Sequence, residues 1–153
     1  MIVYRLSRRK YKSQLSGRGA SIHGARWNRK GTEVIYTASS RALAMAEVLV
    51  HFTLQKFPDD YFMLMIYVAD GIPQYNITED KLPSRWNLFP YSHETQNIAD
   101  DLFQEKKYGL IRVPSAVVKG DYNYLIDPTH EDFDQIKIVD EEAFPFDERL
   151  VYS

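Results

Sequence analysis

The sequence contains no cysteine, which excludes disulfide bonds and every chemistry that needs a thiolate. It also contains no apolar run near the roughly 18 residues that a membrane-spanning helix requires. The first ten residues carry charges with no long apolar stretch after them, unlike a secretory signal peptide. From these absences we expect a protein of the cytoplasm that does not engage a membrane.

Motifs for metal ions and common cofactors are missing as well. The four histidines are not paired at ligand spacing, and neither an HExxH motif nor an EF-hand loop is present. No Walker or Rossmann glycine pattern occurs, and the Gly-x-Ser-x-Gly turn of serine hydrolases is absent. We therefore expect neither a metal site nor a resident cofactor.

The composition that remains is that of one globular domain. Hydrophobic residues make up 44% of the 153 residues and charged residues 26%. No repeat or linker divides the chain, so we expect a single domain over residues 1–153. Alternation and turn signals predict an α+β fold with mostly antiparallel sheets and a few helices. The strands are expected at residues 2–6, 33–37, 61–69, 109–113, 115–118, 122–126 and 135–139, and the helices from Ser39 or Ser40 through Leu54 and over 92–107, with a Ser- and Gly-rich loop over 11–24.

The charges are unevenly distributed, although the formal net charge is only −2. Residues 1–32 contain nine Lys or Arg and no acid, whereas residues 120–153 contain ten Asp or Glu and two bases. This asymmetry has two interpretations. One is an anion site for phosphates or nucleic acid near the N-terminal third. The other is that the two ends neutralise each other in the folded chain.

Glu47 is a lone charge in the expected helix, because residues 42–54 contain no other Asp, Glu, Lys or Arg. The apolar stripe of this helix runs through Leu43, Ala46 or Glu47, Val50 and Leu54. A carboxylate on or beside such a stripe loses hydration and needs a partner or a function. It is either a structural ion pair with Arg26 or with His51, or a carboxylate in a partly dry cleft that stabilises a cation or orients a hydroxyl.

The turn Gly24-Ala25-Arg26-Trp27-Asn28 brings a guanidinium, an aromatic face and an amide together. Arginine binds phosphate bidentately, so Arg26 is a candidate ligand for an anionic group, with Trp27 and Asn28 beside it. The alternative is a surface loop that Trp27 pins to the core.

Two further polar residues accompany expected strands. Ser115 follows Pro114, which holds the chain extended and lacks a sheet donor. Its hydroxyl is either presented at a sheet edge or simply begins a strand. Alternation over residues 122–127 places Asn123 on the face opposite the tyrosines, which makes Asn123 a candidate polar contact.

Taken in order, these stretches resemble the RES domain, a family named for an Arg, a Glu and a Ser. The resemblance assigns the three named positions to Arg26, Glu47 and Ser115 and extends over most of the chain. The chain departs from the family pattern at Asp127, where Asn is common, and at Gly120-Asp121, where an acidic-Asn context is more usual. The matching segments are Gly24–Asn28, Val34–Ser40, Ala42–His51, Pro114–Val118 and Asn123–Pro128.

The resemblance implies a fold like that of the ADP-ribosyltransferase toxins and an activity that takes NAD as its substrate. The nicotinamide–ribose bond would break by hydrolysis or phosphorolysis through an oxocarbenium-like centre. Glu47 would stabilise positive charge on the ribose, Arg26 would bind the diphosphate or an incoming phosphate, and Ser115 would fix the nicotinamide amide or the ribose. The other expected substrate contacts are Trp27, Asn28, Asn123 and Tyr36, whose ring would stack on the nicotinamide.

RES proteins are the toxin halves of bacterial toxin–antitoxin pairs. The resemblance therefore implies an Xre-like helix-turn-helix antitoxin that covers the cleft and through which alone nucleic acid is bound. Two other functions stay open at this point. One is transfer of ADP-ribose to a protein, and the other is a non-enzymatic module that binds nucleic acid with the basic N-terminal third. The aromatic-rich surface also allows a homodimer.

Overall fold

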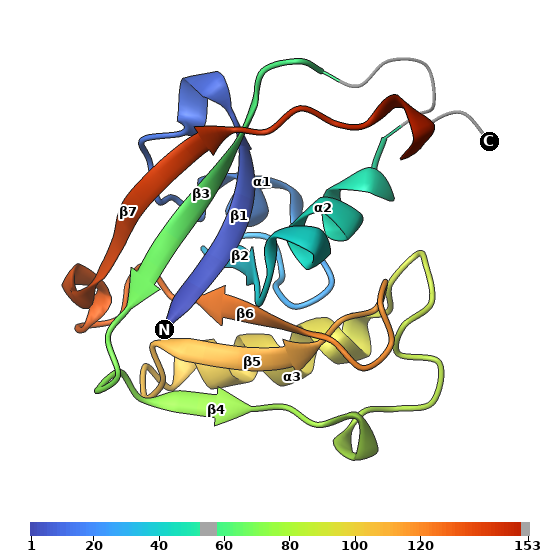
Figure 1. The fold of residues 1–153 in the computed structure, drawn as a ribbon. Coiled ribbons are helices and arrows are strands. Elements are labelled where there is room, and N and C mark those ends of the chain that lie inside the picture. The colour runs from blue at the N-terminus through green and yellow to red at the C-terminus, as the bar shows by residue number, and fades with distance from the viewer. Residues whose placement is uncertain (53–57, 151–153) are drawn as a thin grey trace.

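The computed structural model describes residues 1–52 and 58–150, which form one seven-stranded sheet and three α-helices (Figure 1). The expected α+β class with a mostly antiparallel sheet is confirmed. The strands are β1 Ile2–Arg8, β2 Ile35–Ala38, β3 Tyr61–Val68, β4 Gln74–Asn76, β5 Leu110–Pro114, β6 Tyr122–Ile126 and β7 Ile136–Ala143. The helices are α1 Arg18–His23, α2 Arg41–Leu49 and α3 His93–Gln104, and short 3-10 turns cover Arg9–Tyr11, Glu79–Lys81, Phe133–Gln135 and Glu148–Leu150.

The strands lie in the order β4-β5-β6-β2-β1-β3-β7. All neighbours are antiparallel except β4 and β5, which run parallel. A parallel pair needs a crossover connection, and α3 lies within the segment that joins these two strands. Figure 1 shows β1, β3 and β7 crossing the direction of β4, β5 and β6, with α3 behind β5 and α2 on the side of the sheet near β2. The strand β4 was not predicted, because three residues carry too little alternation to identify.

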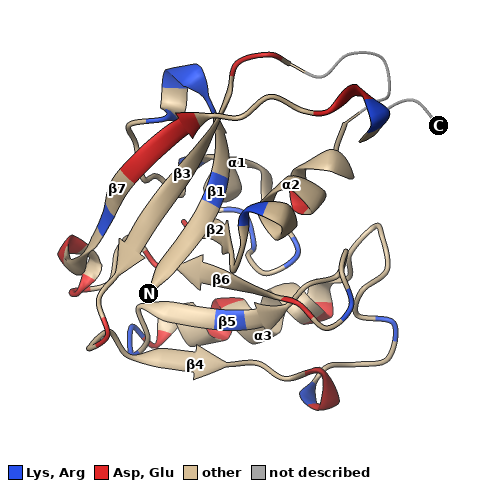
Figure 2. Cartoon of the chain, in the orientation of Figure 1, with Lys and Arg blue, Asp and Glu red and all other residues tan. Residues whose placement is uncertain are grey.

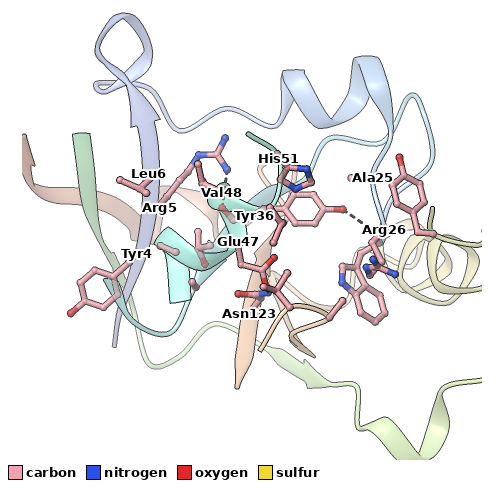
Figure 3. A pocket seen from close by; sticks show the side chains of 18 of the residues that line it. Tyr4, Arg5, Leu6, Ala25, Arg26, Tyr36, Glu47, Val48, His51 and Asn123 are labelled. Carbon is pink, nitrogen blue, oxygen red and sulfur yellow. Dashed lines mark hydrogen bonds between the residues drawn. The ribbon is translucent and has the colours of Figure 1, made fainter. Parts of the chain in front are cut away.

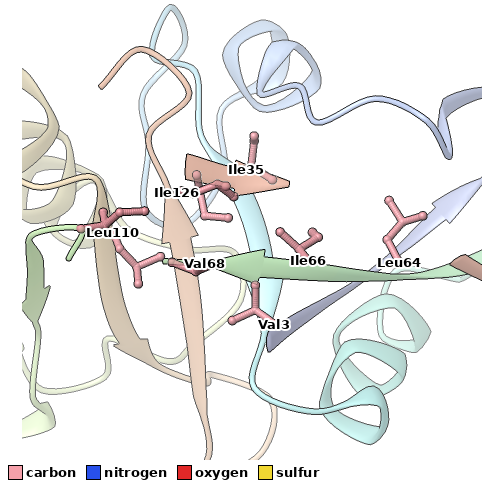
Figure 4. Close-up of a cluster of buried hydrophobic side chains, with 9 residues drawn as sticks. Val3, Ile35, Leu64, Ile66, Val68, Leu110 and Ile126 are labelled. Atoms are coloured by element: carbon pink, nitrogen blue, oxygen red, sulfur yellow. The ribbon is translucent and has the colours of Figure 1, made fainter. Parts of the chain in front are cut away.

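The core consists of three groups of buried apolar side chains. The central group joins the two halves of the sheet through residues such as Val3, Leu64 and Ile126 (Figure 4). A second group packs beneath α3, around Phe103. The third packs beneath α2, where Leu43 meets residues of β1 and β3. Helices α2 and α3 are therefore each held against the sheet by one buried face, and the rest of α2 lines a cavity.

Helix α2 begins as expected, because the Ser40 side chain accepts a hydrogen bond of 3.1 Å from the Leu43 amide. It ends at Leu49, whereas the sequence predicted a helix through Leu54. The prediction is therefore wrong for residues 50–52, and residues 53 and 54 lie outside the described residues. Val50 follows the last turn and is 58% exposed, so it does not continue the buried stripe. Over residues 1–52 and 58–150, no helix has the length and apolar character needed to cross a bilayer.

The Ser- and Gly-rich segment 11–24 is more ordered than predicted, because it contains α1. Ser16 Oγ accepts a hydrogen bond of 3.1 Å from the Arg18 amide at the start of this helix. The helix begins beside β2, where a Cβ atom on Gly17 would lie 2.5 Å from the Val34 nitrogen. This close approach therefore requires glycine at position 17. Because glycine is also typical of loops, the sequence predicted a loop where α1 begins.

The segment 115–118 is a turn and not the predicted strand. The Ser115 hydroxyl accepts hydrogen bonds from the amides of Val117 and Val118, at 3.1 and 2.9 Å. These bonds curl the backbone back on itself directly after β5. Local side-chain bonding of this kind cannot be seen in an apolar run.

The oppositely charged ends of the chain largely do not neutralise each other. Figure 2 shows the acidic part of β7, and one of its residues, Glu141, pairs with Lys12. In the described part of the chain, this is the one ion pair that joins residues 1–32 to residues 120–153. Arg5 and Arg26 have no carboxylate partner there, so the anion-site interpretation applies to them.

Candidate functional site

A cavity of about 630 Å³ lies between α2, β1, β2 and the segments around residues 26, 89 and 117 (Figure 3). This volume is within the range of about 300–1,000 Å³ that is typical of small-molecule sites. Five of the seven predicted site residues line it: Arg26, Trp27, Tyr36, Glu47 and Asn123. Two do not, and these are Asn28 and Ser115.

Glu47 projects from α2 into this cavity and is held through one carboxylate oxygen. Oε1 accepts hydrogen bonds from the Ser115 hydroxyl at 2.7 Å and from the Asn123 amide at 2.6 Å. Within residues 1–52 and 58–150, Oε2 accepts no hydrogen bond, and Glu47 forms no ion pair with Arg26 or His51. The structural ion pair that was the alternative for Glu47 is therefore absent, and one oxygen remains for a ligand.

Ser115 does not line the cavity and contacts the site through Glu47. It is 3% exposed, and its hydroxyl donates to Glu47 while accepting from the two amides of the following turn. The expected contact of Ser115 with substrate stays a prediction, and in this structure the side chain is enclosed by its own bonds. It is a positioning residue that orients the Glu47 carboxylate.

Asn123, on β6, is the second group that orients Glu47. Its Nδ2 donates to the carboxylate, while its Oδ1 is buried and has no hydrogen-bond partner in the described structure. A buried unpaired acceptor costs about 1–3 kcal/mol. Such groups are rare in native structures, and here the cost falls on the residue that orients Glu47.

Arg26 lies on the wall of the cavity opposite α2. One guanidinium nitrogen, Nη1, donates to the backbone oxygens of Trp86 at 2.7 Å and Leu88 at 3.1 Å, and the group lies 5.9 Å from the centre of the Tyr91 ring. Burial lowers the pKa of Arg26, and the negative charge of Glu47 opposes that shift. A partly desolvated cation without a carboxylate partner is suited to an anionic ligand.

The other two residues of this turn belong mainly to the scaffold. Trp27 is buried and packs against Trp86 at a ring distance of 5.9 Å, as the pinned-loop alternative expected, although its edge reaches the cavity. Asn28 is fully buried, and its Nδ2 donates to three backbone oxygens. The Asn28 side chain is therefore engaged by the scaffold, and its expected contact with substrate stays a prediction. Gln96 of α3, which the sequence did not single out, also holds this turn by donating to the oxygens of residues 25 and 28.

Tyr36, on β2, presents its ring to the cavity while its hydroxyl is tied to the scaffold. The hydroxyl donates to Asn28 Oδ1 at 2.6 Å and accepts from the Trp27 amide at 3.2 Å. Burial raises the pKa of Tyr36 above its ordinary value, and the Trp27 amide opposes the shift. The phenol therefore stays neutral, and the ring is fixed in an orientation that allows stacking.

Arg5 is a site residue that the sequence argument missed. It lies on β1, lines the cavity and donates a hydrogen bond of 2.8 Å to the backbone carbonyl oxygen of Tyr36. Burial lowers the pKa of its guanidinium. The signal that identified Glu47, a lone charge in an apolar segment, also applies to Arg5 within residues 2–6.

The charged groups of the cavity form a simple arrangement. In Figure 3, Glu47 and Tyr36 lie between Arg5 and Arg26. Two cations and one carboxylate thus face the same space, and His51 lines it from the end of α2. No group of three or more His, Asp or Glu residues suited to a metal ion occurs over residues 1–52 and 58–150.

Comparison with known proteins places this chain among relatives of similar length. A family model described as the RES domain matches residues 2–147. A protein named Toxin Res from Photorhabdus laumondii is 39% identical over 155 residues, which cover 99% of this chain and 97% of the relative. A protein named Prs ADP-ribosylating toxin from a Sphingobium species is 34% identical over 139 residues, which cover 90% and 86% of the two chains.

A solved structure shares the fold. A chain in the crystal structure of the Mycobacterium tuberculosis MbcT–MbcA toxin–antitoxin complex matches with a TM-score of 0.79. The match covers 94% of this chain and 84% of that chain, at 20% sequence identity. At this identity the likeness concerns the arrangement of the strands and helices.

Proposed function

Because the chain belongs to the RES family, we propose that it is the toxin of a toxin–antitoxin pair and that it consumes NAD by breaking the nicotinamide–ribose bond. The name of the Photorhabdus relative supports the first part. The observation that carries the second part is the Glu47 carboxylate, fixed at Oε1 and open at Oε2 in a cavity with two unpaired arginines.

The charges of the cavity complement those of NAD. The dinucleotide carries two negative charges on its diphosphate and one positive charge on its nicotinamide ring. Arg5 and Arg26 supply two positive charges without carboxylate partners, and Glu47 supplies one negative charge. Desolvated charges are costly when unpaired, so a ligand that pairs all three gains affinity and orientation.

The bond to be broken needs charge stabilisation more than proton transfer. When the C–N bond breaks, its electron pair goes to the ring nitrogen, and nicotinamide leaves as a neutral molecule without a general acid. The ribose carbon becomes oxocarbenium-like, as in glycoside cleavage. A carboxylate about 4 Å away gains roughly 4 kcal/mol at an effective dielectric constant near 20. If realised only in the transition state, that energy accelerates the reaction several hundredfold.

Neighbouring groups complete the proposed site. The Tyr36 ring, held by its hydroxyl, stacks on the nicotinamide. Asn123, whose Nδ2 donates to Glu47 Oε1 at 2.6 Å, keeps the carboxylate in place beside the ribose. Water attack on the ribose gives ADP-ribose and a proton, whereas phosphate attack gives a phosphorylated ADP-ribose.

The test is to incubate the purified protein with NAD, with and without inorganic phosphate, and to quantify nicotinamide and the second product. We expect release of nicotinamide without any protein target, and the second product identifies the acceptor. Glu47→Gln should reduce kcat several hundredfold while preserving the fold. The matched control is Glu105→Gln, at an exposed position outside the cavity, which should leave the rate unchanged. A Glu47→Gln protein that consumes NAD at the wild-type rate contradicts the proposal.

The antitoxin, which we propose to be an Xre-like helix-turn-helix protein, inhibits by covering the cavity. Three exposed apolar side chains at the cavity support this: Val50, Phe89 and Val117. Added antitoxin should abolish turnover or raise the apparent KM for NAD. A stable complex with unchanged kinetics would contradict this mode of inhibition.

A second candidate reaction is transfer of ADP-ribose to a protein. It is favoured by the name of the Sphingobium relative, which describes that protein as an ADP-ribosylating toxin. NAD labelled in its adenosine half, incubated with the toxin and a cell extract, separates the two reactions. Label that becomes attached to a protein, with little nicotinamide released in the absence of extract, favours transfer. Rapid release without extract favours consumption.

A further inference from the structure

One aromatic ring of the cavity is unusually exposed. Phe89 lines the cavity and yet is 78% accessible to solvent. In the described part of the chain its ring contact is with Tyr91, at a centroid distance of 6.4 Å and an interplanar angle of 73°. A ring at the mouth of a cavity with so much free surface is suited to stack on a flat ligand.

The position of this ring is coupled to Arg26. The Arg26 guanidinium donates to the oxygens of Trp86 and Leu88, the second of which directly precedes Phe89. The same guanidinium lies 5.9 Å from the centre of the Tyr91 ring. The contacts therefore run from the cation to Tyr91 and on to Phe89, so a ligand phosphate at Arg26 would lie next to this pair of rings.

We propose that Phe89, supported by Tyr91, is the stacking site for the purine base of a dinucleotide whose reacting ribose lies at Glu47. This inference rests on the proposed function and assigns a direction to the substrate. The base and its ribose would extend from Glu47 past Arg26 and not toward β1.

Among the residues that the structure describes, the opposite direction offers no comparable platform. On the β1 side of the cavity the aromatic residue is Tyr4 (Figure 3). The Arg41 guanidinium lies over its ring, 4.9 Å from the ring centre. That face of Tyr4 is already covered, whereas Phe89 is 78% exposed. Because stacking on one aromatic side chain recognises the flat face of a base and not its polar edge, we expect purines to bind with little discrimination among them.

The test compares a ligand that carries the adenine base with one that keeps only the diphosphate. Calorimetry would give Kd for ADP-ribose, which contains adenine, and for inorganic pyrophosphate, which does not. Phe89→Ala should raise Kd for ADP-ribose about 10-fold, within the range measured for loss of one stacked base. It should leave pyrophosphate binding unchanged, and Phe89→Trp should restore ADP-ribose binding. The matched control is Tyr11→Ala, which removes an exposed ring outside the cavity and should change neither value.

The outcomes separate this inference from the proposed function. If Phe89→Ala weakens both ligands equally, or weakens neither, the stacking site is refuted. If the wild type binds ADP-ribose no more tightly than pyrophosphate, it is refuted as well. If NAD is not cleaved but ADP-ribose binding depends on Phe89, the cleavage proposal fails and the stacking site stands. If NAD is cleaved and Phe89→Ala binds ADP-ribose normally, the stacking site alone fails.

Discussion

Replacing Ser115 with alanine tests whether this residue works only through Glu47. The substitution removes a hydrogen bond of 2.7 Å to the carboxylate and the acceptor for two backbone amides. The carboxylate keeps the bond from Asn123 but can rotate about it. We therefore expect the negative charge to remain in the cavity but to lose its fixed orientation.

Two magnitudes follow from these contacts. A hydrogen bond to a charged group contributes about 1.5–3 kcal/mol, so kcat should fall roughly 10- to 100-fold while KM changes little. The turn amides belong to Val117, which is exposed, and Val118, which is partly exposed, so water can replace the hydroxyl there. The free energy of unfolding should therefore decrease by only about 1 kcal/mol.

The assay is a double-mutant cycle on nicotinamide release, combined with urea unfolding of each protein. If Ser115 acts through Glu47, Ser115→Ala should cost nothing further in the Glu47→Gln background, although its effect on stability persists. A loss of the same size in both backgrounds would refute the reasoning, since it would mean that Ser115 contacts the reacting groups directly.

Three further predictions concern the cavity walls and the scaffold. Arg26→Gln and Arg5→Gln should each raise KM for NAD about 10-fold or more, because each removes a desolvated cation from an anion site; steady-state kinetics with an unchanged KM would contradict this. Asp100→Asn should lower the free energy of unfolding by about 2–3 kcal/mol in urea titrations, because this buried carboxylate accepts from the Arg29 backbone and side chain. Burial holds the pKa of Tyr36 above its ordinary value of 10.0, so above that pH the unfolded chain binds fewer protons and stability falls as pH rises. Tyr36→Phe should make that fall shallower, and an identical slope in both proteins would count against the shift.

The fold was largely predictable where the hydrophobic pattern has one interpretation. The apolar run 61–69 became β3, which is paired on both sides, and residues 92–107 contained α3. The predictions that failed depend on contacts between distant segments or on local side-chain bonds. Glycine at position 17 is required by its approach to Val34, and the turn after Ser115 is formed by the serine hydroxyl. Neither effect has a periodic signature.

The site was predictable to the extent that a charge in an apolar setting is costly wherever it occurs. That argument identified Glu47 correctly as a residue facing a cavity, and the same argument would have identified Arg5. The same cost applies to polar residues that contact a ligand and to polar residues that only orient neighbouring side chains, so it does not distinguish the two. Asn28 and Ser115 are both polar, both close to the cavity and both enclosed by their own hydrogen bonds. Only the partners of each atom distinguish these roles, and those partners come from remote parts of the chain.

Both side chains that orient the Glu47 carboxylate come from the β5–β6 hairpin. Ser115 directly follows β5, and Asn123 on β6 pairs with Val113 of β5 across the ladder. The antiparallel pairing of β5 and β6 therefore fixes the spacing of the two donors independently of α2. Because both donors converge on Oε1, Oε2 is left as the oxygen that faces a substrate cation. A change that disrupts the hairpin without touching Glu47 should therefore reduce kcat as strongly as the loss of either donor.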